Sequence, residues 1–474
     1  MSKRKPMNKK CQVFTPSDYV EKLLDCVSYK HDLYGKRIME NSCGDGRILE
    51  VIVQRYIDDC RAAGFSCTKI KNGLAKDING AEIDPEQFKI CVSRLDEIVK
   101  QNNIGKVDWN IACDDYLKMD DQGGYDYVVG NPPYITYSEL KEKDQEYLRD
   151  SFSSCEKGKF DYCYAFLEKS LDSLSAHGRM AYLIPSSVYK TVFGEAIRKK
   201  MLPYVEEVID YTQAKLFQNA LIKSSIIVMN KEKNNTLIHY VDESSDVEKF
   251  LDKKNLKNKW IFSQINQGDK RFGDYFKVSH VVATLCNEAF VLKEWHYDEA
   301  QNYICDGFVL ENNLVRDAVS PKNMHTGHRE KIIFPYTYDN NHKLIKYSED
   351  EFAKLFPGGY KYLKRFREKL DKRKSDSIAK WFEYGRSQAL RHLDSDKVLI
   401  STIISNEVAI YRLNRRAIPY SGMYVVALSD QMSIDNAVDV LQADEFLEYV
   451  KIVGVPINGK SVRITSKDIE NYRF

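Results

Sequence analysis

The feature that most constrains the fold is a regular alternation of short β-rich runs with helical stretches over roughly the first 240 residues. Parallel strands need a long crossover between them, usually a helix, so this alternation predicts an α/β fold with a mostly parallel sheet. The β-rich runs cover residues 37–40, 78–83, 110–113, 125–129, 180–184, 205–211 and 225–229. The helical stretches include residues 17–26, 48–58, 85–99 and 164–174.

The length of the chain indicates two domains. At 474 residues it exceeds a typical single domain, and each half is large enough for its own core. The polar segment NKEKNN at residues 230–235 interrupts the alternation, which does not resume after it. We therefore predict an α/β domain over residues 1–240 and a mixed α+β domain over residues 241–474.

Charge and cysteine usage exclude several classes of protein. The 71 basic and 69 acidic side chains leave a net charge of +2, so any binding of nucleic acid must use local patches. None of the eleven cysteines forms a CxxC pair, which favours reduced thiols over disulfides or a metal site. We expect no signal peptide and no membrane span. Only ten residues precede Cys11, so we also expect no amino-terminal nuclease.

Three of the predicted strands end in residues suited to a nucleoside ligand. The first runs into the glycine-containing turn NSCGDG (41–46), which allows close approach of a ligand but is as often structural as functional. The second ends in AEIDP (81–85), where Glu82 suits the two hydroxyls of a ribose and Asp84 suits a helix N-cap before Pro85. The third ends in CDDYL (113–117), where a carboxylate could accept an adenine amino group. Because the carboxyl ends of parallel strands share one edge, we expect one binding site there.

The fourth strand delivers the tetrapeptide NPPY at residues 131–134. A planar, conjugated nitrogen is a poor nucleophile, and two fixed acceptors can restore its lone pair. The Asn131 side-chain oxygen and the Pro132 carbonyl are such acceptors, while Tyr134 offers a flat face on which a substrate ring can stack. Taken alone the tetrapeptide could be an ordinary turn. In this context it predicts methylation of an amino or amide nitrogen.

Taken in order, the motifs resemble one family. FTP (14–16) before a helix, the glycine turn, AEID, DDYL and GNPPY resemble the γ-class, Taq-type N6-adenine DNA methyltransferases of restriction-modification systems. The resemblance continues through residues 158–169, 178–185 and 216–226, and so covers most of residues 12–230. It implies a Rossmann-like domain that depends on S-adenosylmethionine, followed by a DNA target-recognition domain. The implied acceptor is an adenine flipped out of a specific sequence of double-stranded DNA.

The resemblance also assigns residues to the cofactor. Thr15 would help to hold the methionine end, with Glu40 beside it, and Glu82 would bind the ribose. Ile83 would lie against the cofactor's adenine ring, and Asp115 would accept its amino group, with Asp114 as the alternative. The full set of implied cofactor residues is Thr15, Glu40, Cys43, Gly44, Glu82, Ile83, Asp115, Tyr116 and Asn131.

For the target base, Asn131 and Pro132 would hold the amino group, and Tyr134 and Phe217 would stack on the ring. By itself Phe217 could equally be a core residue before a strand. One departure from the family is Asn41, where a proline is usual, so we expect a less rigid glycine turn.

In the second half a basic run is the candidate DNA-binding region. Residues 359–397 hold 12 basic and 6 acidic side chains interleaved with aromatic residues, as phosphate neutralisation requires. A solvated helix face explains residues 361–374 equally well. The turn GRSQ (385–388) presents residue types that bond base edges and phosphates. The candidate DNA contacts are Lys364, Arg386, Ser387, Gln388 and Arg391.

Other functions stay open at this point. Cytosine-N4 methylation is the nearest alternative, and NPPY also serves enzymes that methylate RNA or a protein glutamine. We expect no metal, a monomer, a cognate endonuclease encoded separately, and a place in a prokaryotic cytoplasm near the nucleoid.

Overall fold

The computed structural model describes residues 15–120, 123–211, 223–232, 235–245, 247–265, 268–457 and 460–474. The chain divides into two compact units, Met1–Phe262 and Ser263–Phe474. Each unit has its own hydrophobic core, and each is described by itself.

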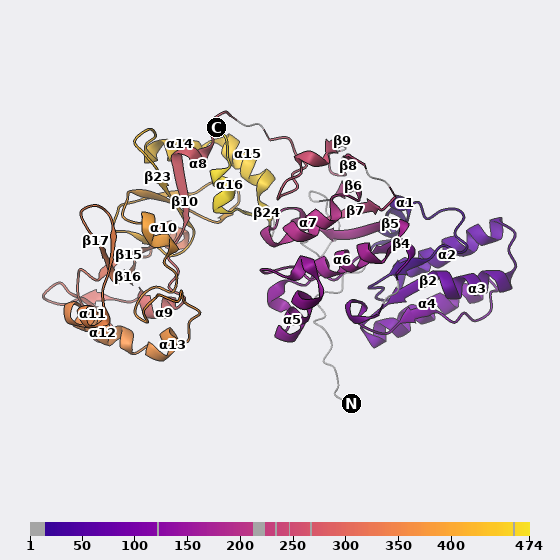
Figure 1. The fold of residues 1–474 in the computed structure, drawn as a ribbon, viewed down its shortest axis with the longest axis horizontal. Helices are drawn as coiled ribbons and strands as arrows, with labels where there is room; N and C mark the ends of the chain where they lie inside the picture. Colours follow the sequence, from indigo (N-terminus) through magenta and orange to yellow (C-terminus); the bar gives the residue numbers. More distant parts are fainter. Residues whose placement is uncertain are drawn as a thin grey trace. The chain divides into compact units, whose positions relative to one another are not determined.

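In the first unit, nine strands of the described residues form one sheet in the order β3-β2-β1-β4-β5-β7-β6-β8-β9 (Figure 1). The first five in this order are parallel to one another, whereas β7 is antiparallel to both β5 and β6. All seven predicted strands are confirmed, and the Rossmann-like α/β fold with them. The bounds are β1 Ile38–Glu40, β2 Ile78–Ala81, β3 Asn110–Ala112, β4 Tyr125–Gly130, β5 Leu174–Pro185, β6 Val205–Asp210, β7 Ser224–Asn230, β8 Leu237–Asp242 and β9 Val247–Asp252.

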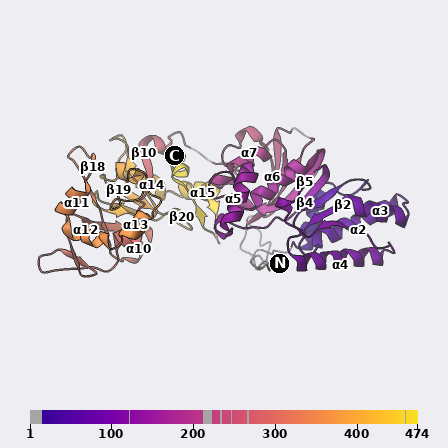
Figure 2. The same cartoon turned by 60° about the horizontal axis from the view of Figure 1, so that its bottom comes forward.

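Helices cover both faces of this sheet. One face carries α1 Ser17–Cys26, α2 Arg47–Ala62, α3 Cys67–Asp77 and α4 Pro85–Gln101. The other carries α5 Glu142–Ser151, α6 Cys163–Ser173 and α7 Glu195–Met201. Helices α2 and α4 lie side by side in both views (Figure 1 and Figure 2). Asp84 caps α4 as predicted, because its carboxylate accepts from the N–H groups of Glu86 and Gln87.

The first unit extends beyond residue 240, where we expected the boundary. Strand β8 pairs in parallel with β6, and β9 returns antiparallel to β8. Ile238 and Tyr240 on β8 are buried in the same core as Val208 of β6. The polar segment after β7 is therefore a connection within the sheet, and the unit ends at Phe262.

The second unit is a mixed α+β structure, as predicted. Its described strands form several small sheets, in the orders β10-β23-β19-β21, β11-β16-β15-β22, β12-β13-β14, β17-β18 and β20-β25-β24. The strands are β10 Phe276–His280, β11 Val291–Leu292, β12 His296–Tyr297, β13 Tyr303–Cys305, β14 Phe308–Leu310, β15 Val315–Val319, β16 Glu330–Ile333, β17 Tyr336–Tyr338, β18 Leu344–Lys346, β19 Lys397–Ile400, β20 Ile403–Ile404, β21 Ile410–Leu413, β22 Ile418–Pro419, β23 Met423–Ala427, β24 Val455–Pro456 and β25 Val462–Arg463. The helices are α8 Phe272–Tyr275, α9 Asn287–Phe290, α10 Pro321–Thr326, α11 Glu349–Leu355, α12 Pro357–Lys364, α13 Arg367–Asp371, α14 Ile434–Gln442, α15 Asp444–Val453 and α16 Ser466–Glu470.

Candidate active site

The carboxyl edge of the sheet gathers the polar residues that follow the first four strands. Parallel pairing places the end of β1 beside the ends of β2 and β4, and the end of β2 beside that of β3. Glu40, Glu82, Asp115 and Asn131 therefore belong to one edge, as the sequence predicts. Glu40, Glu82 and Asp115 are buried polar groups.

Glu82 ties two loops of this edge together. Its carboxylate accepts from the N–H of Gly44 at 2.7 Å and from the N–H of Asp84 at 2.8 Å. Burial raises the pKa of the Glu82 carboxyl, while these bonds to backbone N–H groups act in the opposite direction. A carboxylate accepts more than two hydrogen bonds, so Glu82 is held in place and keeps capacity for hydroxyl donors.

The edge passes a chemical test for S-adenosylmethionine. The Oε2 atom of Glu40 is buried without a hydrogen-bond partner in the described structure, and burial raises the pKa of this carboxyl well above its usual range. A buried carboxylate oxygen of this kind lacks the hydrogen-bond donor or cation that would compensate for its lost contact with water. At Gly44, whose φ is +52°, an added Cβ would meet nothing within 4 Å, so open space lies above the turn. Ile83 is 36% exposed and offers an apolar surface. These carboxylate acceptors and this apolar surface suit the cofactor's ammonium group, its ribose hydroxyls and its adenine ring.

The buried Cys43 is fixed through its backbone and its thiol. Its N–H donates to the carbonyl of Ala81 at 3.0 Å. Its sulfur lies 4.0 Å from that of Cys91, and the contact with Cys91, followed by burial, raises the pKa of the Cys43 thiol. Its carbonyl accepts from the N–H of Gly46 at 2.8 Å, so its role at the cofactor stays a prediction.

The two candidate aspartates after β3 have different surroundings. Asp115 is buried, caps the short helical turn Tyr116–Lys118 by accepting from the Leu117 N–H, and lies 2.9 Å from the Lys118 ammonium. Asp114 is exposed and accepts from the N–H of Asp115 at 2.8 Å. The ring of Tyr116 is buried against Phe166, with 5.8 Å between ring centroids. Of the two aspartates, Asp115 is the buried one.

The NPPY loop after β4 is held from two sides. The Ser42 hydroxyl donates to the backbone carbonyl of Asn131 at 3.3 Å, and the Asn131 side-chain amide nitrogen donates to the Thr15 hydroxyl at 3.3 Å. Because the nitrogen is directed to Thr15, the amide oxygen points the other way. Ser42, which follows β1, and Thr15, which precedes α1, thus set the orientation of Asn131. Pro132 is buried beside it.

Of the two aromatic residues predicted to stack on the target base, the structure describes Tyr134. The Tyr134 hydroxyl is buried, which raises the pKa of this phenol, whereas the residue as a whole is only half-buried. Its ring is therefore anchored by the hydroxyl end, an arrangement that suits stacking. Phe217 lies outside the described residues.

A second segment, at residues 161–162, contacts the residues that directly follow NPPY. The N–H of Tyr162 donates to the carbonyl of Ile135 at 2.9 Å, and Asp161 pairs with Thr136 as an isolated β-bridge. Burial raises the pKa of the Asp161 carboxyl to about 6, and a 3.4 Å bond from the Tyr164 hydroxyl only partly offsets it. In the sequence, Asp161 is marked only as part of the motif GKFD at residues 158–161. Its burial follows from long-range packing.

Asn41 corrects our expectation of a less rigid glycine turn. Its amide nitrogen donates to the Ser170 hydroxyl at 2.6 Å and to the hydroxyl of Tyr182. Those two hydroxyls are themselves 2.6 Å apart. The side chain is 2% exposed, so the turn is anchored to α6 and β5 by buried hydrogen bonds in place of the ring of a proline.

Sequence reasoning missed a group of lysines at the same edge. Lys190 follows β5, Lys223 precedes β7, and Lys259 precedes Trp260, whose N–H donates to the carbonyl of Tyr189 at 2.9 Å. The N–H of Ser186 donates to the carbonyl of Lys223 at 2.9 Å. Burial lowers the pKa of Lys190 to about 8, and the positive charges of Lys259 and Lys223 lower it further, against the attraction of Asp210. We call Lys190, Lys223 and Lys259 the lysine cluster. No sequence signal marks it, because the three residues are far apart along the chain.

In the second unit the predicted basic run separates into two parts. Its aromatic residues Tyr362, Phe382 and Tyr384 are buried in the core, so these three do not offer faces to bases, whereas Tyr360 and Phe366 are partly exposed. Arg373 is structural too, since its guanidinium donates to the backbone carbonyls of Thr284, Trp381 and Glu383. The predicted contacts Lys364, Arg386 and Gln388 are exposed, as is Arg391, and Ser387 is half-buried.

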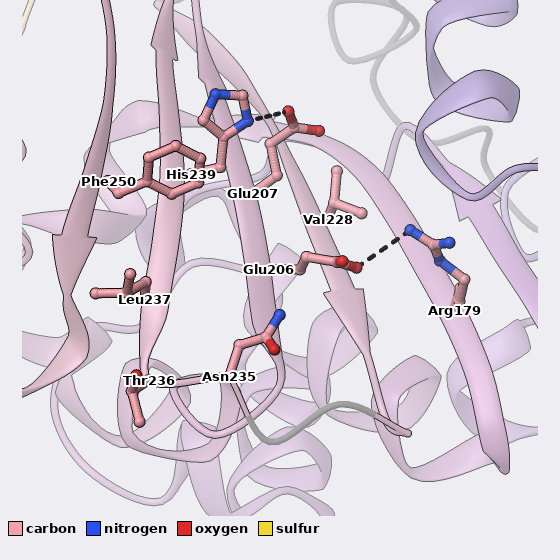
Figure 3. Close-up of a pocket in the computed structure, with 9 residues that line it drawn as sticks. All are labelled: Arg179, Glu206, Glu207, Val228, Asn235, Thr236, Leu237, His239 and Phe250. Atoms are coloured by element: carbon pink, nitrogen blue, oxygen red, sulfur yellow. Dashed lines mark hydrogen bonds and ion pairs between the residues drawn. The ribbon is translucent and has the colours of Figure 1, made fainter.

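In the first unit, a hollow of about 490 Å³ lies across β5 to β9 (Figure 3). Its charged side chains are paired with one another. Arg179 bonds Glu206 at 3.1 Å and His239 bonds Glu207 at 2.8 Å. None of the predicted site residues lines it.

The described part of the chain contains no cluster of His, Cys, Asp or Glu that could hold a metal ion. None of its helices is both long and apolar enough to cross a membrane.

The fold and the edge residues together define an α/β methyltransferase-like domain. Residues 36–217 match the family model of the Eco57I restriction-modification methylases. The predicted resemblance to DNA methyltransferases of restriction-modification systems is therefore confirmed.

Individual relatives agree. The chain is 26% identical to the type II restriction enzyme and methyltransferase RM.Eco57I of Escherichia coli, over 63% of this chain and 34% of that protein. It is 25% identical to the type II methyltransferase M.PaeR7I of Pseudomonas aeruginosa, over 46% of this chain and 40% of that one. The chain thus spans well under half the length of these relatives. Among solved structures, the type IIL restriction-modification enzyme MmeI in complex with DNA shares the fold, with a TM-score of 0.58 and 14% identity over 95% of this chain and 63% of that one.

Proposed function

We propose that this chain is a site-specific DNA methyltransferase that transfers a methyl group from S-adenosylmethionine to N6 of an adenine flipped out of double-stranded DNA. The observation that carries the proposal is the setting of Asn131. Its carbonyl is held by Ser42 and its amide by Thr15, beside the buried carboxylates Glu40 and Glu82.

The residues of the carboxyl edge would hold the cofactor. The unpartnered Glu40 oxygen suits its ammonium group, Glu82 its ribose hydroxyls and Asp115 its adenine amino group, with Ile83 against the adenine ring. When bound, S-adenosylmethionine supplies a methyl group on a positively charged sulfur. The protein's part in catalysis is then to bring an amino nitrogen into line and to exclude water.

The NPPY loop would activate the target nitrogen. The Asn131 side-chain oxygen and the Pro132 carbonyl accept the two amino hydrogens, which draws the lone pair out of the ring system. Extrusion of the base costs a few kcal/mol. Stacking on Tyr134, with Phe217 as the proposed second face, recovers roughly 1 to 3 kcal/mol per base.

DNA binding would use both units. The lysine cluster places positive charge at the catalytic edge, where phosphates next to a flipped base have to lie. The second unit, with Lys364, Arg386, Ser387, Gln388 and Arg391, would recognise the target sequence. We propose that the chain acts as a γ-class modification enzyme, as a monomer, with its endonuclease encoded separately.

Analysis of methylated nucleosides tests the proposal. The purified protein is incubated with S-adenosylmethionine and plasmid DNA, RNA or protein, and the products are identified by mass spectrometry. N6-methyladenine in the DNA is the expected product. N4-methylcytosine would move the activity to the nearest alternative, and methylated RNA or glutamine with unmodified DNA would overturn the DNA assignment.

Asn131→Ala provides the control. It removes one of the two acceptors, so methyl transfer should be lost while the Kd for S-adenosylmethionine stays unchanged. A loss of cofactor binding would show that the assigned roles are wrong.

A further inference from the structure

One carboxylate in the second unit organises the GRSQ turn. Asp376 accepts from the Arg386 guanidinium at 2.9 Å, and from the N–H and the hydroxyl of Ser387 at 3.0 and 3.1 Å. Its own N–H donates to the carbonyl of Gly385 at 2.9 Å. We call Asp376 with Gly385, Arg386 and Ser387 the Asp376 clamp.

The backbone beneath the clamp is fixed. The N–H groups of Gly385 and Arg386 donate to the carbonyls of Thr284 and Ala283, at 3.3 and 3.1 Å. A Cβ at position 385 would lie 2.6 Å from the Leu285 side chain, so this close approach requires glycine. The Arg386 side chain is nevertheless 44% exposed. The clamp therefore presents an accessible guanidinium from a rigid support.

We propose that the Asp376 clamp positions Arg386 to read the edge of a guanine in the DNA target, an inference that rests on the proposed function. Arginine recognises guanine by donating two parallel hydrogen bonds to O6 and N7 in the major groove. Asp376 takes one of the five N–H donors of the guanidinium, and the others can serve such a pair of bonds. Holding the side chain in advance also reduces the entropy lost on binding.

The charge of the pair favours a base over a phosphate. Asp376 and Arg386 together carry no net charge, so they attract a phosphate only weakly, and a carboxylate close to the backbone of DNA is repelled by it. A base edge is neutral and is recognised by the geometry of its donors and acceptors. Lys364 is exposed on α12 and serves as the comparison for an ordinary phosphate contact.

Methylation contexts in whole genomes provide the test. Wild type and the variants Asp376→Asn, Arg386→Lys and Lys364→Ala are expressed in a bacterium without adenine methylation, and modified adenines are mapped by sequencing. Asp376→Asn and Arg386→Lys should both relax the same single guanine position of the recognition sequence. The preference for that guanine should fall at least about fivefold, the lower end for one bidentate contact. The double variant should be no more relaxed than Arg386→Lys alone, because the two residues act as one unit.

Binding of the purified proteins to duplex DNA at several salt concentrations gives a second readout. The slope of log Kd against log salt should stay unchanged in Arg386→Lys and Asp376→Asn. In Lys364→Ala it should decrease by about one, with the recognition sequence intact. Arg386→Lys keeps its charge and guards against simple misfolding, and thermal unfolding is measured for every variant.

The outcomes are distinguishable. If wild type methylates a defined sequence but Arg386→Lys retains every position of it, the clamp does not read a base and the inference is wrong. The same holds if Asp376→Asn relaxes a different position from Arg386→Lys. If wild type methylates no DNA, the proposed function itself fails and the inference falls with it.

Discussion

Asn131 and Thr15 share a hydrogen bond although 116 residues separate them. The sequence assigned Thr15 to the cofactor and Asn131 to the target, and the structure joins the two side chains. Orientation of an amide is decisive where one oxygen must accept from a reacting group, because a rotated amide presents donors instead. Under the proposed function, Thr15 would therefore act on methyl transfer through Asn131.

Thr15→Val should reduce kcat about tenfold, which corresponds to the loss of one hydrogen bond of about 1.4 kcal/mol. The Kd for S-adenosylmethionine should change by less than about twofold if the hydroxyl serves Asn131 and not the cofactor. Stopped-time methylation assays and calorimetry give the two numbers. Thr15→Ser keeps the hydroxyl and should retain most of the activity. A large change in cofactor affinity with kcat unchanged would return Thr15 to the methionine end.

Asp161 makes stability depend on pH. Its pKa is raised to about 6 in the folded protein from an ordinary value near 3.8, so the folded state holds the proton more tightly than the unfolded state. The stabilisation of the folded state by proton binding at Asp161 is fully present below about pH 4 and is lost as pH rises through 6. Asp161→Asn removes the titration, so the variant should exceed wild type in free energy of unfolding by about 2 to 3 kcal/mol at pH 8.

Urea denaturation at pH 4.5 and at pH 8 measures this free energy. The difference in free energy of unfolding between variant and wild type should be smaller at the lower pH. Asp150→Asn on the exposed side of α5 measures the general effect of removing a carboxylate. An equal gap at both pH values would show that Asp161 is not buried as described.

Local patterns predicted some residues and not others. Asp84 before Pro85 is an N-cap whose partners lie within three residues, so the sequence was sufficient. The contact of Thr15 with Asn131 and the partners of Asn41 depend on which strands become neighbours. Periodicity in one segment carries no such information, and the same holds for the buried aromatic residues Phe382 and Tyr384.

At the scale of elements, the seven predicted strands were found as short β-rich runs bounded by turn residues. Strands β8 and β9 escaped prediction. β9 is an edge strand with exposed Glu248 and Phe250, so its pattern is not that of a core strand. The pairing of β8 with β6 is a long-range contact that buries Ile238 and Tyr240.

The lysine cluster joins elements that are distant in sequence, and it predicts a pH dependence of DNA binding. With a pKa of about 8, Lys190 is charged below that pH and neutral above it. Losing one solvent-exposed contact between a lysine and a phosphate weakens the binding free energy by about 1 kcal/mol. The affinity for duplex DNA should therefore fall about fivefold as pH rises through 8. Lys190→Arg stays charged and should flatten the profile.

Fluorescence anisotropy at constant ionic strength between pH 7 and pH 9 measures this affinity. Lys199→Arg, on the exposed side of α7, is the matched control and should follow wild type. An unchanged profile in Lys190→Arg would separate the lysine cluster from DNA binding.

At the scale of the molecule, the two units differ in how far sequence could describe them. The first has a repeating βα pattern that fixes its topology through the rule that parallel strands require crossovers. The second is made of short strands in several small sheets, and its order of pairing cannot be read from alternation alone. Its candidate contacts were found from composition, which identified Arg386 but also pointed to residues that form the core.

Separate cores also predict separable functions. The fragment of residues 1–262 keeps the sheet, both of its helical layers, the carboxyl edge and the lysine cluster. It should fold alone and bind S-adenosylmethionine with a Kd within about threefold of the intact chain, because no residue of the proposed cofactor site comes from the second unit. It should bind duplex DNA weakly and without preference for sequence, since a few lysines supply only the electrostatic part of the affinity. Calorimetry with the cofactor and competition between cognate and scrambled duplexes measure both properties. Asn131→Ala in the same fragment should leave both unchanged, whereas methylation of the native sequence contexts by the fragment would place target recognition in the first unit.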